Sequence, residues 1–122
     1  MTKEEWTVMI SEACQKAGTY QEQFRYVIDT LAQIMEDRDK AHAQYVEDGG
    51  RPTIIHVNRA KEANVVKNPM LVMEMELNAQ ALAYWRDLGL TPAGLRKLNA
   101  DAVKEKTVTV NLESILEGLA DG

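Results

Sequence analysis

The sequence predicts a mainly helical fold, a helical hairpin or bundle that carries a small β-ribbon. Three observations predict it. Apolar residues recur at three- and four-residue steps over most of the chain. Helix starts are marked by capping residues at Thr2, Thr19, Asn68 and Thr91. One short segment rich in basic and β-branched residues, 49–67, interrupts the helical pattern.

A chain of 122 residues has the length of a single domain. We expect four parts within it: two helices in residues 1–48, a basic ribbon in 49–67, a helical pair in 68–99, and a short strand followed by a helix in 100–122. No repeat of fixed period and no low-complexity segment divides the chain further.

The charge is distributed unevenly along the chain, whose net charge is −5. Residues 1–48 carry ten acidic and five basic side chains, residues 70–99 are balanced, and residues 100–122 carry five acidic and two basic ones. Residues 49–69 are the only basic block, with four basic side chains against one acidic one. The composition argues against a protein coated with positive charge for indiscriminate nucleic-acid binding, and positive charge is concentrated only in the middle block.

Targeting signals and cysteine usage predict a cytoplasmic protein. No stretch of eighteen consecutive apolar residues occurs, and the first residues, MTKEEWTVM, lack the basic and apolar segments of a secretory signal. We therefore expect no membrane partner. The single Cys14 has no partner for an internal disulfide, and its place on the apolar side of a helical pattern predicts a buried, inert thiol.

The N-terminal helix is predicted from its two ends. Thr2 and Glu5 have the spacing of a capping box, and apolar residues then follow helical periodicity until Gly18 breaks the pattern. Thr19 and Glu22 repeat the capping-box spacing and predict the start of a second, longer helix.

The second helix is expected from about residue 20 to 46 and has one long apolar seam that reaches Tyr45. Such a helix is about 40 Å long, whereas a compact chain of this size is about 35 Å across. The seam would then extend beyond its own domain, and a second copy of the chain is the natural cover. The alternative is that the helix after residue 68 covers most of the seam within one chain.

The segment after Gly49-Gly50 predicts a ribbon. Residues 53–57 and 63–67 are short and β-branched, and residues 58–62 between them form a basic tip without a glycine to mark the turn. A third short strand is available at 107–110, where polar and apolar residues alternate. The sequence leaves open whether this strand, Val108 to Val110 in particular, pairs within one subunit or between subunits.

The stretch 68–99 predicts two helices with a sharp turn between them. Asn68 can cap the first helix and Pro69 takes its first position, where a backbone donor is not needed. Gly89 can end that helix in a left-handed conformation, with the next residue folding back as the apolar partner of a Schellman cap. Thr91 and Pro92 open the second helix, which we expect to end near residue 99.

The residues that carry chemistry predict a protein that is not an enzyme and holds no metal or cofactor. His42 and His56 are the only histidines, and neither has a second ligand at metal-binding spacing. No glycine-rich phosphate loop and no recognisable nucleophile motif occurs. The methionines at 70, 73 and 75 are better explained as packing residues between helices than as a soft-metal site.

The candidate DNA-binding residues are the four basic side chains of the ribbon segment: Arg51, Arg59, Lys61 and Lys67. They can lie along a phosphate backbone, with Asn58 and Asn64 adding hydrogen bonds. Four charges make a modest electrostatic footprint in one copy, and repetition around an assembly would strengthen it. A solvated loop with ordinary solubilising side chains is the alternative interpretation.

Several sequence motifs resemble those of the small subunit of tailed-phage terminase. The resemblance covers about residues 20–100 and lies in a glycine pair after a long helix, an Asn-Pro helix start and a Leu-Gly-Leu-Thr-Pro helix junction. The matching runs are Val46 to Gly50, Lys67 to Pro69, Tyr84 to Pro92 and Arg96 to Leu98.

The resemblance implies a non-enzymatic, homo-oligomeric component of viral genome packaging in the host cytoplasm. Such a subunit assembles as a ring, binds viral double-stranded DNA and recruits or regulates the terminase large subunit, an ATPase and nuclease. DNA contact through the first two helices, with Gln21, Gln23 and Arg25 at the start of the second, is less attractive because acidic residues surround that site. The alternative function is a helical structural or adaptor protein of a phage or mobile element with no DNA contact of its own.

Overall fold

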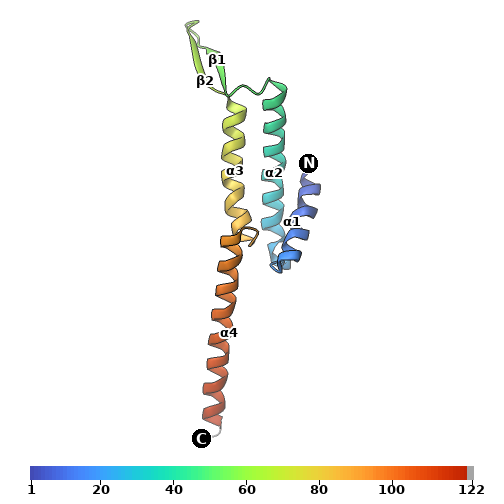
Figure 1. The fold of residues 1–122 in the computed structure, drawn as a ribbon, viewed down its shortest axis with the longest axis vertical. Coiled ribbons are helices and arrows are strands. Elements are labelled where there is room, and N and C mark those ends of the chain that lie inside the picture. The colour runs from blue at the N-terminus through green and yellow to red at the C-terminus, as the bar shows by residue number, and fades with distance from the viewer. Residues whose placement is uncertain (121–122) are drawn as a thin grey trace.

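The computed structural model describes the backbone of residues 1–120, together with the side chains of residues 1–105 and 112–119. Figure 1 shows α1, α2 and α3 side by side, the ribbon projecting beyond one end of α2 and α3, and α4 extending in the opposite direction. The mainly helical fold with a small ribbon is confirmed. In chain order the elements are α1 (Lys3–Ala17), a 3-10 turn η1 (Glu22–Phe24), α2 (Arg25–Glu47), β1 (Thr53–Val57), β2 (Ala63–Lys67), α3 (Pro69–Asp87) and α4 (Pro92–Ala120).

The N-cap predicted at Thr2 forms at the start of α1, but the one predicted at Thr19 does not. The Thr2 hydroxyl accepts a hydrogen bond from the Glu5 backbone N–H at 3.2 Å, and Gly18 ends the helix at φ +74°. The Thr19 hydroxyl instead donates to the carbonyl of Leu88 at 2.7 Å. The prediction for Thr19 was wrong because a distant carbonyl at the end of α3 takes its hydroxyl, and α2 begins through η1 without a side-chain cap.

The apolar seam of α2 is covered largely within the chain. Its buried residues run from Ile28 to Ala41, and they pack with Trp6, Ile10 and Cys14 of α1 and with the C-terminal part of α3. At the end of the seam, Tyr45 is only partly exposed and its hydroxyl donates to the Gly50 carbonyl at 2.7 Å. A second copy is therefore not needed to cover this seam, and the alternative of intrachain coverage by the helix after residue 68 holds.

The two predicted strands form with the expected bounds and pair antiparallel. Ile55 lies opposite Val65, and His56 lies opposite Asn64. Every residue of both strands is exposed, so the ribbon contributes nothing to the core. Both faces of the ribbon are therefore open to contact with water or with another molecule.

The predicted junction between α3 and α4 is confirmed in detail. Gly89 adopts φ +71°, its N–H donates to the Arg86 carbonyl, and the Leu90 N–H donates to the Trp85 carbonyl at 2.9 Å, which is the Schellman arrangement. The Thr91 hydroxyl then accepts from the Gly94 N–H at 3.0 Å and caps α4.

The C-terminal part differs from the sequence prediction. Residues 107–110 are helical, and α4 runs without a break from Pro92 to Ala120 instead of ending near residue 99. The predicted strand was wrong for two physical reasons. Alternation over four residues is a weak signal that depends on a partner strand, and the ribbon lies at the other end of the molecule. The preceding residues 100–106 contain no helix breaker, so helix propagation continues through them.

Candidate nucleic-acid interface

The four predicted basic residues lie on the ribbon segment in two separate pairs. Arg51 precedes β1 and Lys67 ends β2, so both are at the base of the ribbon. Arg59 and Lys61 are in the turn at the tip. Five residues of extended strand place the two pairs roughly 17 Å apart. The four basic side chains therefore lie in two separate pairs along the projecting ribbon segment, residues 49–67, which we call the arm.

All four side chains are exposed, and none of them forms an ion pair with the part of the chain that the structure describes. The only acidic residue of the ribbon segment, Glu62, is at the tip, where its carboxylate contacts the Asn58 amide at 3.5 Å. Most of the positive charge of the arm is therefore available to a binding partner, whereas the rest of the chain has a net negative charge.

The base of the ribbon is fixed by Asn68, a buried polar residue at the start of α3. Its side-chain oxygen accepts from the Met70 N–H and its amide donates to the Arg51 carbonyl, both at 3.0 Å. Its backbone N–H donates to the Pro52 carbonyl at 2.9 Å. One residue therefore caps α3 and joins the two ends of the ribbon. The sequence indicated only the cap, because the other two partners are seventeen and sixteen positions away.

The tip is organised by Asn58. Its carbonyl accepts from the Lys61 N–H at 3.0 Å, and its side-chain oxygen accepts from the Glu62 N–H at 2.9 Å. Lys61 adopts a left-handed conformation with φ +62°, which supplies the reversal that a glycine supplies in many hairpins. The Asn58 side chain is thus engaged in the turn, whereas Asn64 stays exposed on the strand and pairs with His56 across the ribbon.

The alternative site at the start of α2 is less suited to a phosphate contact. The Arg25 guanidinium lies over the Tyr26 ring, 4.9 Å from its centroid, and 3.8 Å from a Glu22 carboxylate oxygen. Gln23 donates to Gln21 within the same turn. The side chains of Gln21, Gln23 and Arg25 are therefore already engaged with neighbouring residues. Acidic side chains of α1 and η1 also lie close in sequence.

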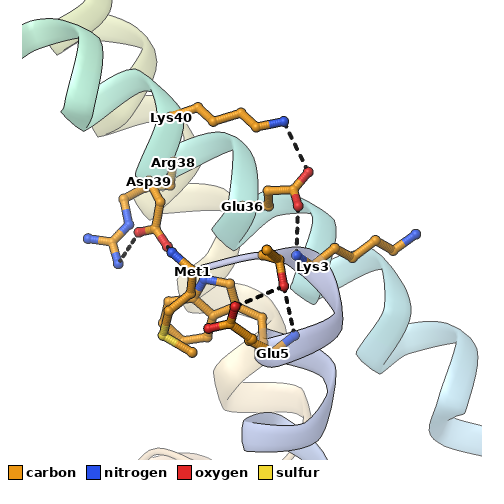
Figure 2. Close-up of polar contacts among 9 residues, drawn as sticks. Met1, Lys3, Glu5, Glu36, Arg38, Asp39 and Lys40 are labelled. Atoms are coloured by element: carbon orange, nitrogen blue, oxygen red, sulfur yellow. Dashed lines mark hydrogen bonds and ion pairs between the residues drawn. The ribbon is translucent and has the colours of Figure 1, made fainter.

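A second polar cluster joins α1 to α2, as Figure 2 shows. The Trp6 indole N–H donates to Asp39 at 2.7 Å, and the amino group of Met1 lies 3.1 Å from the same oxygen. Burial tends to raise the pKa of Asp39, but the hydrogen bonds from Trp6 and from that amino group, with the charge of Arg38, lower it below its usual value.

Glu36 forms the other half of this cluster. It accepts from the Lys3 backbone N–H at 2.7 Å and from the Lys40 ammonium at 3.2 Å, and these contacts lower the pKa of Glu36, the Lys3 hydrogen bond most of all. These carboxylates hold α1 against α2, and neither is part of the ribbon.

The remaining reactive side chains have structural surroundings. Cys14 is buried, as predicted, and burial raises the pKa of its thiol, which disfavours the reactive thiolate. His42 contacts the Glu74 carboxylate at 3.0 Å and links α2 to α3. Among the residues that the structure describes, no three His, Cys, Asp or Glu side chains gather in a group able to hold a metal ion.

Fold and site together define a small helical protein that presents a basic β-ribbon at one end of a three-helix bundle. Within the described residues, no helix is both long and apolar enough to span a bilayer.

The model of the family described as "Phage terminase, small subunit" matches residues 2–105, and the chain belongs to this family. The match also includes α1 and residues 101–105 of α4, both outside the region where the motifs resemble the family. The family takes part in packaging DNA into phage particles, generally as a non-catalytic subunit. Comparison with curated proteins and with solved structures gives no significant match.

Proposed function

We propose that this protein binds viral double-stranded DNA through its projecting ribbon and recruits or regulates the terminase large subunit, in the host cytoplasm. The observation that carries the DNA proposal is the arm itself. It holds the only basic block of an acidic chain, all four of its cations are exposed, and it projects away from the helices.

The shape of the arm suits the duplex. The major groove of B-DNA admits a two-stranded β-ribbon, and phosphates flank the groove on both sides. If the tip of the arm enters the groove, Arg59 and Lys61 lie inside the groove. Arg51 and Lys67, at the base of the arm, then lie near the phosphates at the edges of the groove. The exposed Asn64, beside His56, is a side chain that can hydrogen-bond to base edges.

Repetition of the arm supports useful affinity. One copy offers four cations, which is a small footprint for DNA binding at physiological salt. A homo-oligomeric ring multiplies the arms on one duplex, and linked weak contacts then act together. We include ring assembly in the proposed function for this reason.

The test measures DNA affinity against salt concentration for the full chain. A plot of the logarithm of the DNA association constant against the logarithm of the salt concentration has a negative slope. Each lost contact between a basic side chain and a phosphate makes this slope shallower by about 0.9. We expect Arg59→Ala with Lys61→Ala to weaken binding and to flatten this slope. The control is Arg96→Ala with Lys97→Ala, which removes the same charge from exposed positions on α4 and is expected to leave both quantities unchanged.

Three results would redirect the proposal. Equal decreases in affinity for both double variants would show binding that depends on total charge and not on the arm. Binding that is indifferent to salt and to the ribbon variant would remove the arm as the DNA site. The absence of any DNA binding by the assembled protein would favour the adaptor function instead.

A further inference from the structure

One face of the ribbon carries most of its exposed apolar surface. Residues that alternate along a strand share a face, so Ile55 and Val57 of β1 lie on the same side as Ala63 and Val65 of β2. Ile55 and Val65 are 72% and 73% exposed. Lys67, opposite Thr53, is on this side as well. We call these six residues the outer ribbon face.

A second exposed apolar surface lies near the end of α4. Its members follow the i, i+3, i+4, i+7 spacing that places side chains on one side of a helix, and they are 56% to 73% exposed. We call them the C-terminal stripe: Leu112, Ile115, Leu116 and Leu119. Glu113 and Glu117, one turn apart, lie along one flank of this stripe, and no basic residue lies between positions 112 and 119.

The two surfaces cannot meet within one molecule, because the ribbon and the end of α4 are at opposite ends of the chain's long axis (Figure 1). An isolated two-stranded ribbon is marginal in water and becomes stable when a helix packs on it. The chain offers such a helix, with an uncovered apolar side and the opposite charge. We propose that the C-terminal stripe of one copy packs on the outer ribbon face of a second copy.

The dimensions and charges of the two surfaces agree. The stripe spans about 10 Å of helix and the outer ribbon face about 13 Å of strand. Glu113 and Glu117 bring negative charge to a segment, 49–69, in which four basic side chains oppose one acidic one. Ribbon-to-ribbon contact brings two basic segments together, and stripe-to-stripe contact in parallel helices aligns the glutamates, so both are electrostatically worse.

The proposed contact is heterologous, since it joins two different surfaces. A repeated heterologous contact closes into a ring or continues as a filament. The stripe lies beyond residues 2–105, the region matched by the family, whereas the outer ribbon face lies within it. Arg59 and Lys61, which the DNA-binding test changes, are in the turn and not on the outer ribbon face, whereas Lys67 belongs both to this face and to the proposed DNA contact.

Cysteine cross-linking tests the contact directly. Full chains with Ile55→Cys are mixed with full chains with Ile115→Cys under mild oxidation, and the linked peptides are identified by mass spectrometry. We expect disulfides between residues 55 and 115 of different copies. The native Cys14 is fully buried, so the unmodified chain serves as the background control. Only 55-to-55 links, only 115-to-115 links, or no links at all would overturn the proposal.

A charge exchange gives a second readout. We expect Glu113→Lys with Glu117→Lys to raise the concentration of half-assembly on the order of tenfold, because like charges then meet at Lys67. Adding Lys67→Glu to that variant should restore part of the assembly. The control, Glu12→Lys with Glu76→Lys, makes the same change of charge at exposed positions on α1 and α3 and should have no effect. Equal effects of both pairs, or no restoration, would overturn the contact, whereas failure of DNA binding alone would leave it standing.

Discussion

The three-helix bundle and the two projecting ends of this molecule are built in opposite ways. In the bundle, apolar side chains of α1, α2 and α3 enclose one another, and helix ends are closed by Gly18, Asn68 and Gly89. The ribbon and residues 112–119 of α4 leave their large apolar side chains exposed. The chain therefore buries large apolar side chains in the bundle and leaves others exposed on the ribbon and on residues 112–119 of α4.

The largest expected effect is a loss of stability of the three-helix bundle. Leu31 is fully buried in α2, and Leu31→Ala removes most of its side chain and leaves a cavity, so we expect the free energy of unfolding to fall by about 2–5 kcal/mol. Denaturant titration of the full chain measures it. Leu116→Ala, at a position that is 64% exposed, is the control for which no comparable drop in bundle stability is expected.

If the two leucine variants were destabilised equally, the division between bundle and projecting ends would be wrong. A destabilisation by Leu116→Ala that depends on protein concentration would have a different meaning, because it would locate the effect in the contact between copies.

A smaller effect on stability is expected at the junction between α3 and α4. A side chain at Gly94 would come within 2.1 Å of the Arg86 carbonyl oxygen, so the backbone of α3 or α4 must shift. We expect Gly94→Ala to cost about 1–3 kcal/mol through overpacking, in spite of the better helix propensity of alanine. Thermal unfolding followed by circular dichroism measures this change.

Gly118 supplies the matched control in the same helix. A Cβ there meets nothing within 4 Å, so Gly118→Ala should stabilise α4 by about 0.5–1 kcal/mol. Opposite signs for the two glycines are the expected result. Stabilisation by both substitutions would mean that helix propensity, and not the close approach to Arg86, determines stability at the junction of α3 and α4.

The local signals in the sequence predicted this structure well where they were complete. Asn68 with Pro69, and Gly89 with Thr91, each contain within a few residues the groups that close a helix end, and each formed as expected. The two strands were also predicted, because β-branched runs on both sides of a short polar tip are themselves a local pattern.

The failures involve partners that are distant in the chain. Thr19 has the capping spacing, yet its hydroxyl donates to the Leu88 carbonyl, sixty-nine residues away. The alternation at 107–110 predicted a strand, but the two strands that the structure describes lie at the opposite end of the molecule and the helix continues. For the candidate site, the sequence placed Arg59 and Lys61 at the tip of the ribbon, and their role in DNA binding stays a prediction. It did not show that Asn68 bonds to the Arg51 and Pro52 carbonyls, because those partners are distant in the chain.

The smallest expected effect tests how α1 is held to the bundle. Hydrogen bonds lower the pKa of Asp39 in the folded chain, so the native state keeps its carboxylate ionised more strongly than the unfolded chain does. The stabilisation is present above the unfolded pKa of about 3.9 and is lost as the pH falls through the lower native value. We expect the free energy of unfolding to decline with acid in this range below about pH 4.

Asp39→Asn should remove this part of the acid dependence and, at pH 7, should cost no more than about 1 kcal/mol, because the carboxylate is partly solvated and its charge interactions are screened. Denaturant titrations at pH 7 and at pH 3 measure both quantities. Asp101→Asn, at an exposed position on α4, is the control and should leave the slope with pH unchanged. An acid slope that survives in Asp39→Asn would show that other carboxylates of the bundle control its acid stability. Because Asp39 joins α1 to α2 and is not part of the ribbon, DNA affinity should be the same in both variants at pH 7, which separates the interactions that hold the bundle from those that the arm offers to a partner.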